Sequence, residues 1–166
     1  MRGICAAIRD LARRHAEVRI VYPVHLNPNV WRPVHELLQD VPRVKLLPPV
    51  DYITLVHLMK NSYLILTDSG GIQEEAPSLG VPVMVLRETT ERPEAVEAGA
   101  ARLVGTDPSR ITLEADKLLN KPAEHAAMAH AINPFGDGRA AQRIVDTLLL
   151  GDCQEFVAGA DGRDPS

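Results

Sequence analysis

The apolar residues of this chain fall into short runs that alternate with segments of helical periodicity, and this alternation limits the folds open to it. The runs with the length and composition of strands are Val18–Tyr22, Val44–Leu47, Tyr63–Thr67, Val83–Leu86 and Ala101–Val104. Helical spacing marks Ile4–His15, Val30–Gln39, Tyr52–Lys60, Ile72–Leu79, Ile111–Asn120, Ala123–Ile132 and Arg139–Leu149. Strands that alternate with helices at these lengths predict an α/β fold with a parallel sheet and right-handed crossovers.

Two segments refine this prediction. Tyr63–Thr67 is almost wholly apolar, as expected for a strand that is covered on both faces. Pro33 falls within a predicted helix and is expected in its first turn, where a proline costs no hydrogen bond. We expect residues 1–150 to form one domain. Residues 151–166, rich in Gly, Asp and Ala, are expected to form a disordered tail.

The composition is that of a globular protein, with 45% hydrophobic and 24% charged residues. No signal-peptide pattern and no apolar run of the ~20 residues needed to span a bilayer is present, so we expect a soluble, cytoplasmic protein with no membrane partner. The net charge of −4 argues against nucleic acid as a partner. Cys5 and Cys153 have no metal-ligand spacing, and we expect a buried or incidental thiol at each and no metal site.

The strongest local signal follows the third predicted strand, where Thr67–Glu75 reads TDSGGIQEE. Glycines at Gly70 and Gly71 let a ligand approach the backbone, and the first N–H groups of the following helix lack partners within it. With the hydroxyl of Ser69, this is a candidate anion site at the carboxyl end of a strand. The same residues also fit a plain strand-to-helix turn that Ser69 or Gly70 caps, and the chemistry alone leaves both interpretations open.

Charged residues near this turn have two possible roles. Glu74 and Glu75 could complement the helix dipole, or one of them could accept hydrogen bonds from sugar hydroxyls; neighbouring helical residues point about 100° apart, so both are not expected to do so. In the loop Arg87–Glu94, Arg92 precedes Pro93 and its backbone is therefore restricted. Arg92 could clamp a phosphate, or the loop could hold only a solvated ion-pair network.

Together these motifs resemble those of the non-hydrolysing UDP-N-acetylglucosamine 2-epimerases. The resemblance rests on DSGGIQEEAPSLGVPV (Asp68–Val83), RETTERPEAVEAG (Arg87–Gly99), YPVHLNPNV (Tyr22–Val30), RLVGTD (Arg102–Asp107) and NPFGDGRAAQRI (Asn133–Ile144). It covers roughly Ile4 to Leu149, and the motifs keep the order and spacing of the family.

The resemblance implies a fold and a reaction. This chain is expected to be the C-terminal, Rossmann-like half of a glycosyltransferase-B arrangement, with helices on both faces of its sheet. The full-length enzyme is expected to form a homodimer. It would interconvert UDP-N-acetylglucosamine and UDP-N-acetylmannosamine by eliminating UDP and adding it back on the opposite face, without a metal or another cofactor.

Residue by residue, the resemblance implies that Ser69, Gly70, Gly71 and Arg92 bind phosphate and that Glu75 binds ribose. It places uracil against the loop Pro49–Tyr52 and the start of the following helix. At the positions of Val50 and Leu55 the better-known members commonly have a glutamine and an aromatic residue. Leu55 cannot stack as an aromatic ring does, so we expect weaker recognition of the base. His25 is a weaker candidate for a catalytic role, because the turn sequence Asn27-Pro28-Asn29 that follows it also fits a structural histidine.

The catalytic residues of the family are expected on an N-terminal domain that this sequence lacks, so we expect the isolated chain not to epimerise its substrate. The last predicted helix, Arg139–Leu149, is expected to expose apolar surface that would otherwise face that domain. Two alternatives remain open. One is a glycosyltransferase with a UDP-sugar donor, and the other is a non-catalytic module that binds nucleotide sugars.

Overall fold

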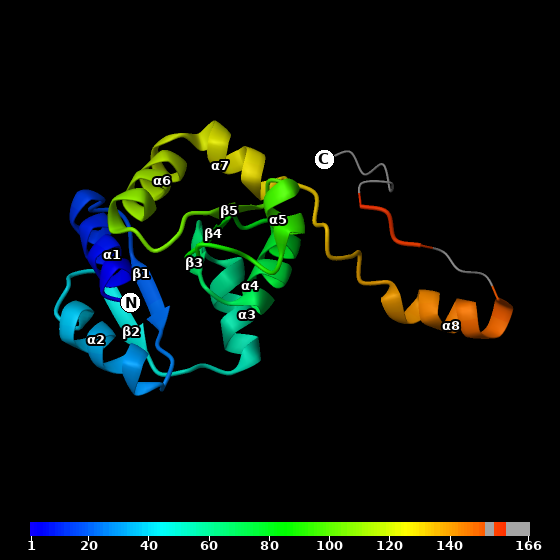
Figure 1. The fold of residues 1–166 in the computed structure, drawn as a ribbon, viewed down its shortest axis with the longest axis horizontal. Coiled ribbons are helices and arrows are strands. Elements are labelled where there is room, and N and C mark those ends of the chain that lie inside the picture. Colours follow the sequence, from blue (N-terminus) through cyan, green and yellow to red (C-terminus); the bar gives the residue numbers. More distant parts are fainter. Residues whose placement is uncertain (152–154, 159–166) are drawn as a thin grey trace.

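A computed structural model describes residues 1–151 and 155–158 (Figure 1). In this part of the chain the strands are β1 (Ile20–Pro23), β2 (Val44–Leu47), β3 (Ile65–Thr67), β4 (Val83–Val85) and β5 (Ala101–Leu103). The helices are α1 (Arg2–Arg14), α2 (Pro28–Leu38), α3 (Tyr52–Lys60), α4 (Gly70–Glu75), α5 (Pro93–Glu97), α6 (Pro108–Asn120), α7 (Pro122–Ala129) and α8 (Ala140–Leu150). A short 3₁₀ helix, η1 (Ala76–Leu79), directly follows α4.

The paired strands are all parallel, which confirms the predicted fold class. Hydrogen bonds join β1 to β2 and, separately, β3, β4 and β5 in that order. The predicted sheet is thus divided into two parallel ladders. The carboxyl ends of β3 and β4 lie at the same edge, because Thr67 pairs with Val85. The loops that follow these two strands are therefore neighbours.

The core lies on both faces of β4. Val83 and Val85 belong to one cluster of buried residues, and Met84 and Leu86 to another. Because successive side chains of a strand point to opposite faces, the sheet separates the two clusters. The cluster with Met84 and Leu86 includes residues of α1, α2 and α6, and the cluster with Val83 and Val85 includes residues of η1 and α5. This arrangement confirms the prediction of a sheet with helices on both faces.

Two details of the prediction were wrong. The helix predicted from Val30 begins at Pro28, after the side chain of Asn27 accepts a hydrogen bond from the Asn29 amide (2.9 Å between N and O), so Pro33 lies inside α2 and not in its first turn. The helix therefore lacks one hydrogen bond to the carbonyl four residues earlier. Helix α5 was missed because five residues make little more than one turn and carry no clear periodicity.

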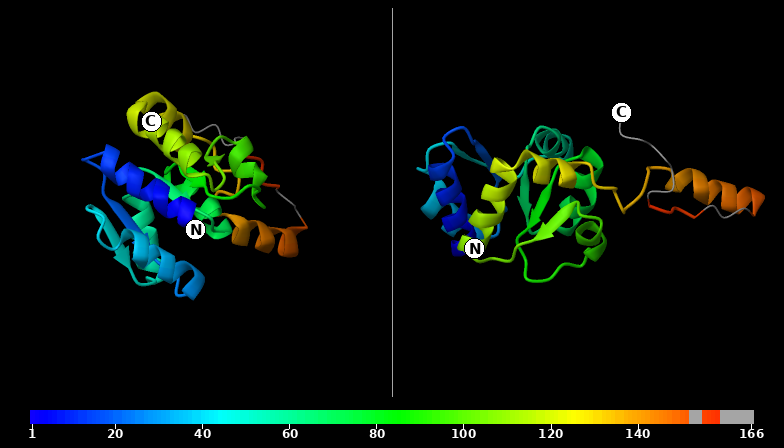
Figure 2. Two further views of the ribbon diagram at one scale, coloured as in Figure 1. Left: turned by 60° about the vertical axis from the view of Figure 1, so that its left-hand side comes forward. Right: turned by 90° about the horizontal axis from the view of Figure 1, so that it is seen from above.

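Helix α8 stands apart from the strands and from α1 to α7, at the end of an extended segment (Figures 1 and 2). None of its residues is buried, and the side chains of Ile144 and Leu148 are 59% and 79% exposed. This confirms that the last predicted helix exposes apolar surface. No helix among the described residues is long and apolar enough to cross a membrane. Of the two cysteines, Cys5 is buried; Cys153 and most of the predicted tail lie outside the described residues.

Candidate functional site

The turn between β3 and α4 is shaped by the threonine that ends the strand. Thr67 is buried, and its hydroxyl oxygen accepts a hydrogen bond from the Ser69 amide over 3.0 Å. Ser69 then occupies the N-cap position in an extended conformation, but its hydroxyl makes no capping hydrogen bond. The first N–H groups of α4 are therefore not satisfied by this side chain, and Ser69 and Gly71 are exposed. The turn therefore presents backbone N–H groups that lack a partner within the helix, at the positive end of the helix dipole.

Three consecutive side chains of α4 contact three different residues, two in the loop of Arg92 and one in α3. Gln73 hydrogen-bonds Thr90, Glu74 pairs with Arg92, and Glu75 hydrogen-bonds Tyr52 in α3. Successive helical residues point about 100° apart, which lets one short helix hold three partners. The two glutamates therefore have different contacts, as expected from their spacing.

Arg92 reaches from the loop between β4 and α5 to the start of α4. Its Nε donates to a carboxylate oxygen of Glu74, and its Nη1 donates to the carbonyl of Glu91 over 2.9 Å. A methyl group built on Gly70 would lie 4.0 Å from Nη2, which places that nitrogen over the turn. The hydrogen bond to Glu74 and the charge of that carboxylate raise the pKa of Arg92 above its usual value. The ion pair thus joins the loop to α4, and it directs Arg92 toward the candidate anion site.

The carboxylate of Glu75 lies between α3 and the glycine turn. Its Oε2 accepts a hydrogen bond from the Tyr52 hydroxyl over 3.0 Å. A methyl group built on Gly71 would lie 3.9 Å from Glu75 Oε1 and 3.9 Å from Ser69 Oγ, so both oxygens border the space above Gly71. The hydrogen bond to Glu75 and the charge of that carboxylate raise the pKa of Tyr52. One oxygen of Glu75 thereby stays near the position where a ligand would approach the turn.

The start of α3 is fixed by Asp51. Its carboxylate caps the helix by accepting hydrogen bonds from the Thr54 amide (2.9 Å) and hydroxyl (2.8 Å), and the bond from the amide is the main cause of its lowered pKa. Val50 precedes this cap and Leu55 lies in the next turn, and both are half-buried. Since Tyr52 joins α3 to Glu75, Leu55 belongs to a helix that contacts the site, and Val50 lies just before the N-cap of that helix.

His25 lies in the loop between β1 and α2. Its Nδ1 accepts a hydrogen bond from the Asn27 amide over 3.1 Å, so that nitrogen carries no proton in this arrangement. The bond stabilises the turn that leads to the N-cap of α2, as expected of a structural histidine. A role for His25 in a catalytic cleft stays a prediction.

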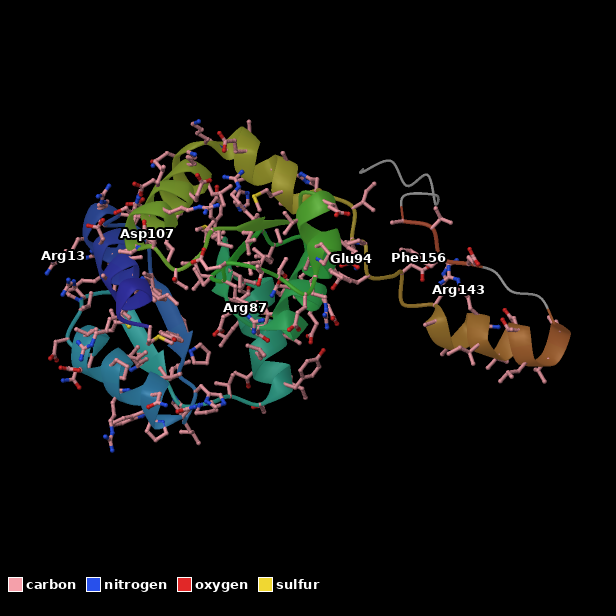
Figure 3. The ribbon with its side chains drawn as sticks, viewed as in Figure 1. Arg13, Arg87, Glu94, Asp107, Arg143 and Phe156 are labelled. Atoms are coloured by element: carbon pink, nitrogen blue, oxygen red, sulfur yellow. The ribbon has the colours of Figure 1, made fainter. Side chains whose placement is uncertain are left out.

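Sequence reasoning missed three residues that organise the site, Gln73, Glu88 and Thr90, and it placed Tyr52 in the loop facing uracil without its bond to Glu75. Glu88 accepts hydrogen bonds from the amide (3.1 Å) and hydroxyl (3.3 Å) of Thr106, which anchors the loop of Arg92 to the loop after β5. Figure 3 labels Arg87 and Glu94, which bracket the loop. The many charged residues of this loop marked it as a candidate part of the site. The partners of its side chains come from other segments, so their spacing along the sequence does not reveal them.

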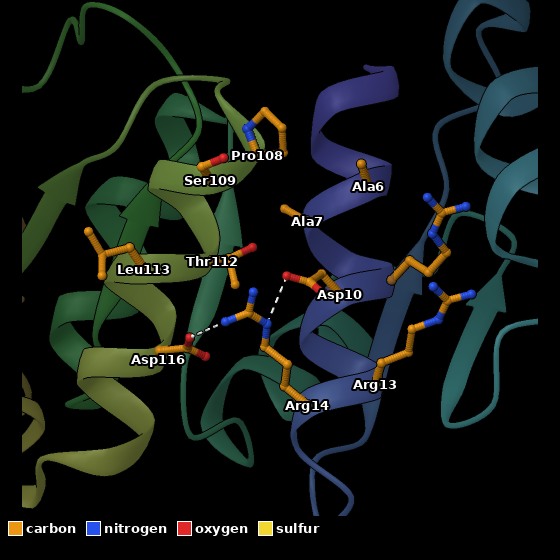
Figure 4. A pocket seen from close by; sticks show the side chains of 11 residues that line it. Ala6, Ala7, Asp10, Arg13, Arg14, Pro108, Ser109, Thr112, Leu113 and Asp116 are labelled. Carbon is orange, nitrogen blue, oxygen red and sulfur yellow. Dashed lines mark hydrogen bonds and ion pairs between the residues drawn. The ribbon is translucent and has the colours of Figure 1, made fainter.

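A separate cavity of about 550 Å³ lies between α1 and α6 (Figure 4). None of the predicted site residues lines it. Arg14 spans it, with ion pairs to Asp10 (2.9 Å) and Asp116 (3.2 Å). Asp116 also contacts His15, at 2.7 Å between Oδ1 and Nε2. These charges therefore satisfy one another across the junction of two helices. In the part of the chain that the structure describes, no His, Cys, Asp or Glu side chains gather in a group that could hold a metal ion.

The fold and the site define a class of protein: a parallel α/β domain with an anion-suited turn at the carboxyl end of β3, flanked by an arginine and a carboxylate. Comparison with known proteins narrows the class, because the model of the UDP-N-acetylglucosamine 2-epimerase family matches residues 1–149. The chain belongs to this family. The predicted relationship is confirmed, and the glycosyltransferase and non-catalytic alternatives are not favoured.

Individual relatives agree with this assignment. The UDP-N-acetylglucosamine 2-epimerase of Escherichia coli K12 is 57% identical over 145 residues, which are 87% of this chain and 39% of the relative. A crystal structure of the Neisseria meningitidis UDP-GlcNAc 2-epimerase bound to UDP-GlcNAc superimposes with a TM-score of 0.86 and 48% identity, over 90% of this chain and 40% of that one. The Methanocaldococcus jannaschii enzyme in complex with UDP-GlcNAc and UDP gives a TM-score of 0.74 and 36% identity, over 90% of this chain and 40% of that one. This chain thus spans about two fifths of the length of these relatives.

Proposed function

We propose that this chain is the UDP-binding half of an enzyme that interconverts UDP-N-acetylglucosamine and UDP-N-acetylmannosamine. The observation that carries the proposal is the convergence of Arg92 Nη2 and the Glu75 carboxylate on the turn Ser69-Gly70-Gly71. The turn and Arg92 would bind the two phosphates, and Glu75 would accept hydrogen bonds from the ribose. Val50, through its backbone, and Leu55 would contact uracil. Relatives that bind UDP or UDP-GlcNAc support this proposal.

The reaction would proceed by elimination of UDP from the sugar and its addition back after protonation on the opposite face. Negative charge grows on the departing diphosphate in such a step. Donors that are already oriented toward the phosphate stabilise this charge without having to reorganise. Arg92, held by Glu74 and by the Glu91 carbonyl, is a donor of that kind. The role of this chain would be to keep UDP bound while it is detached from the sugar.

The proton-transfer groups and the rest of the cleft would lie in the part of the relatives that this chain does not span. The apolar side of α8, which includes Ile144, Val145 and Leu148, would contact that part, because these side chains are exposed in the described chain. Homodimerisation of the full-length enzyme also stays a prediction.

Calorimetric titration of UDP into the chain tests the proposed site. Ser69→Ala, Glu75→Ala and Arg92→Ala should each weaken binding about tenfold, as expected for a lost hydrogen bond to a charged group. Arg13→Ala serves as the control, because Arg13 lies on α1 beside the cavity in Figure 4 and lines none of the site. A second ligand sharpens the assignment of Glu75: 2′,3′-dideoxy-UDP should bind the wild type and Glu75→Ala equally. A folded wild-type chain that binds no UDP would contradict the proposal.

The activity is tested separately. UDP-N-acetylglucosamine incubated with the chain alone should give no 2-epimer in the NMR spectrum. Turnover by the chain alone would show that its own residues transfer the proton, and the division of labour proposed above would be wrong.

A further inference from the structure

Gln73 is a polar side chain buried in the core of the site. Only 1% of its surface is exposed, yet both ends of its amide are used. Nε2 donates to the Ser69 carbonyl over 3.1 Å, and Oε1 accepts from the Thr90 hydroxyl over 2.6 Å. A carbonyl can only accept, so the nitrogen must face Ser69 and the oxygen must face Thr90. A buried amide with both ends satisfied favours one arrangement of its neighbours over others.

Thr90 continues this chain of hydrogen bonds into the arginine loop. Its hydroxyl gives its only hydrogen to Gln73 and accepts the Arg92 amide N–H over 3.0 Å. A continuous path therefore runs from the Ser69 carbonyl through Gln73 and Thr90 to the backbone of Arg92. The two ends of this path are the glycine turn and the arginine that lies over it.

The path matters because the two ends come from different loops. Ser69 follows β3 and Arg92 follows β4, and parallel pairing fixes only the strand ends. Without a further constraint the arginine loop would have to be ordered when ligand binds, at a cost in affinity. The Glu74 carboxylate orients the guanidinium, whereas Thr90 fixes the backbone from which the side chain departs.

We propose that Gln73 and Thr90 are positioning residues that hold the Arg92 loop in register with the Ser69 turn before the ligand arrives. The expected effect of this positioning, tighter binding of a nucleoside diphosphate, rests on the proposed function. The positioning itself does not depend on that function, because the unliganded chain makes these hydrogen bonds.

The test uses variants of similar size. Thr90→Val removes the hydroxyl and keeps the shape, whereas Thr90→Ser keeps the hydroxyl. Thr112→Val is the control, because it makes the same change at a buried threonine of α6 that lies outside this path. The first readout is the NMR signal of the Arg92 Nε–H group in the absence of ligand, assigned by its loss in Arg92→Lys. This signal should move toward that of a free arginine in Thr90→Val and should stay in place in Thr90→Ser and Thr112→Val.

The second readout is affinity for UDP. Thr90→Val should weaken binding about tenfold, and Thr90→Ser should restore it to within about twofold. In an Arg92→Lys background, Thr90→Val should have less than about a twofold further effect, because a residue that acts through Arg92 has little left to position. Gln73→Met, which removes both amide contacts, should move the Arg92 signal in the same direction, and it provides an independent variant if Thr90→Val does not fold.

The outcomes separate the two proposals. An Arg92 signal that is unchanged in the folded Thr90→Val and Gln73→Met chains would overturn the positioning role, whatever the affinity for UDP. Equal effects of Thr90→Val with and without Arg92 would also overturn it. A wild-type chain that binds no UDP, but whose Arg92 signal responds to Thr90→Val, would overturn the proposed function and leave the positioning of Arg92 supported.

Discussion

The hydroxyl of Tyr52 donates a hydrogen bond to Oε2 of Glu75, with 3.0 Å between the two oxygens. This contact joins the first residue of α3 to the last residue of α4 and orients a carboxylate beside the glycine turn. Tyr52 is 64% exposed, so packing holds it only loosely, and the hydrogen bond is its defined contact in the described structure.

Tyr52→Phe is therefore expected to weaken UDP binding about threefold to tenfold, because Glu75 loses the donor that orients it. Calorimetry measures the effect. Tyr63→Phe is the control: Tyr63 is also partly exposed, but its hydroxyl lies near the Leu118 carbonyl, at 3.4 Å, and contacts no site residue. Equal affinities for Tyr52→Phe and Tyr63→Phe would show that Glu75 needs no such support.

Glu74→Gln should weaken UDP binding without removing any group assigned to touch the ligand. The amide that replaces the carboxylate is neutral, so it holds Arg92 Nε less strongly. We expect a smaller loss than in Arg92→Ala, where the guanidinium itself is removed. Titration of both variants at low and high salt distinguishes them, since only Arg92→Ala should reduce the salt dependence of binding.

Gly3→Ala should destabilise the fold, although alanine usually stabilises a helix relative to glycine. A Cβ at this position would lie 2.8 Å from the Thr106 carbonyl oxygen, closer than any normal contact. The start of α1 would have to move from the loop after β5, at a cost of about 1–3 kcal/mol in the free energy of unfolding. Urea denaturation tests this, and a rise in stability would mean that the two segments do not touch.

Tyr22 should make stability fall at alkaline pH. Burial, with smaller contributions from Cys5 and Asp68, raises its pKa from 10.0 to about 12. A group with a raised pKa contributes stability that is complete below its unfolded pKa and is lost as pH rises through the folded one. The thermal midpoint of the wild type should therefore fall more steeply between pH 10 and about 12 than that of Tyr22→Phe. Parallel curves for the two chains would contradict this expectation.

Leu148→Lys should leave the free energy of unfolding within about 0.5 kcal/mol of the wild type, because Leu148 lies on α8, where no residue is buried. The same change should reduce association between copies of the chain, which light scattering can measure. Leu118→Ala, at a fully buried leucine of α6, is the contrasting control and should cost about 2–5 kcal/mol. A comparable loss in Leu148→Lys would place α8 in the core.

The order of elements could be predicted from the sequence because the periodicity changes sharply between β4, with every residue buried, and amphipathic helices such as α6. The strand-to-helix turn at Ser69 could be located for the same reason. Helix α5 could not, because one turn gives no period to detect. The division of the strands into two ladders could not be predicted either, because the residue pattern of one strand does not show which strand it will hydrogen-bond.

Within the site, the sequence identified the residues that stand out chemically and missed the residues that hold them. Arg92 and Glu75 are charged and follow glycines or precede a proline, so local chemistry marks them. Gln73 and Thr90 are ordinary in their local sequence, and their role comes from a contact between residues that are 17 positions apart in the chain. Such pairs are visible only once the chain is folded.

Helix α4 gives this domain a constraint on sequence length as well as on sequence identity. Its three partner-bearing residues are consecutive, so inserting or deleting one residue before Gln73 would turn each of them by about 100° toward the wrong neighbour. An insertion would put the glutamine in the place of Glu74 and a deletion would put it in the place of Ile72, so the arginine loop and α3 would lose their attachments together. A substitution in this helix can remove one contact at a time, whereas a change in its length would separate the glycine turn from both the arginine loop and α3 in a single step.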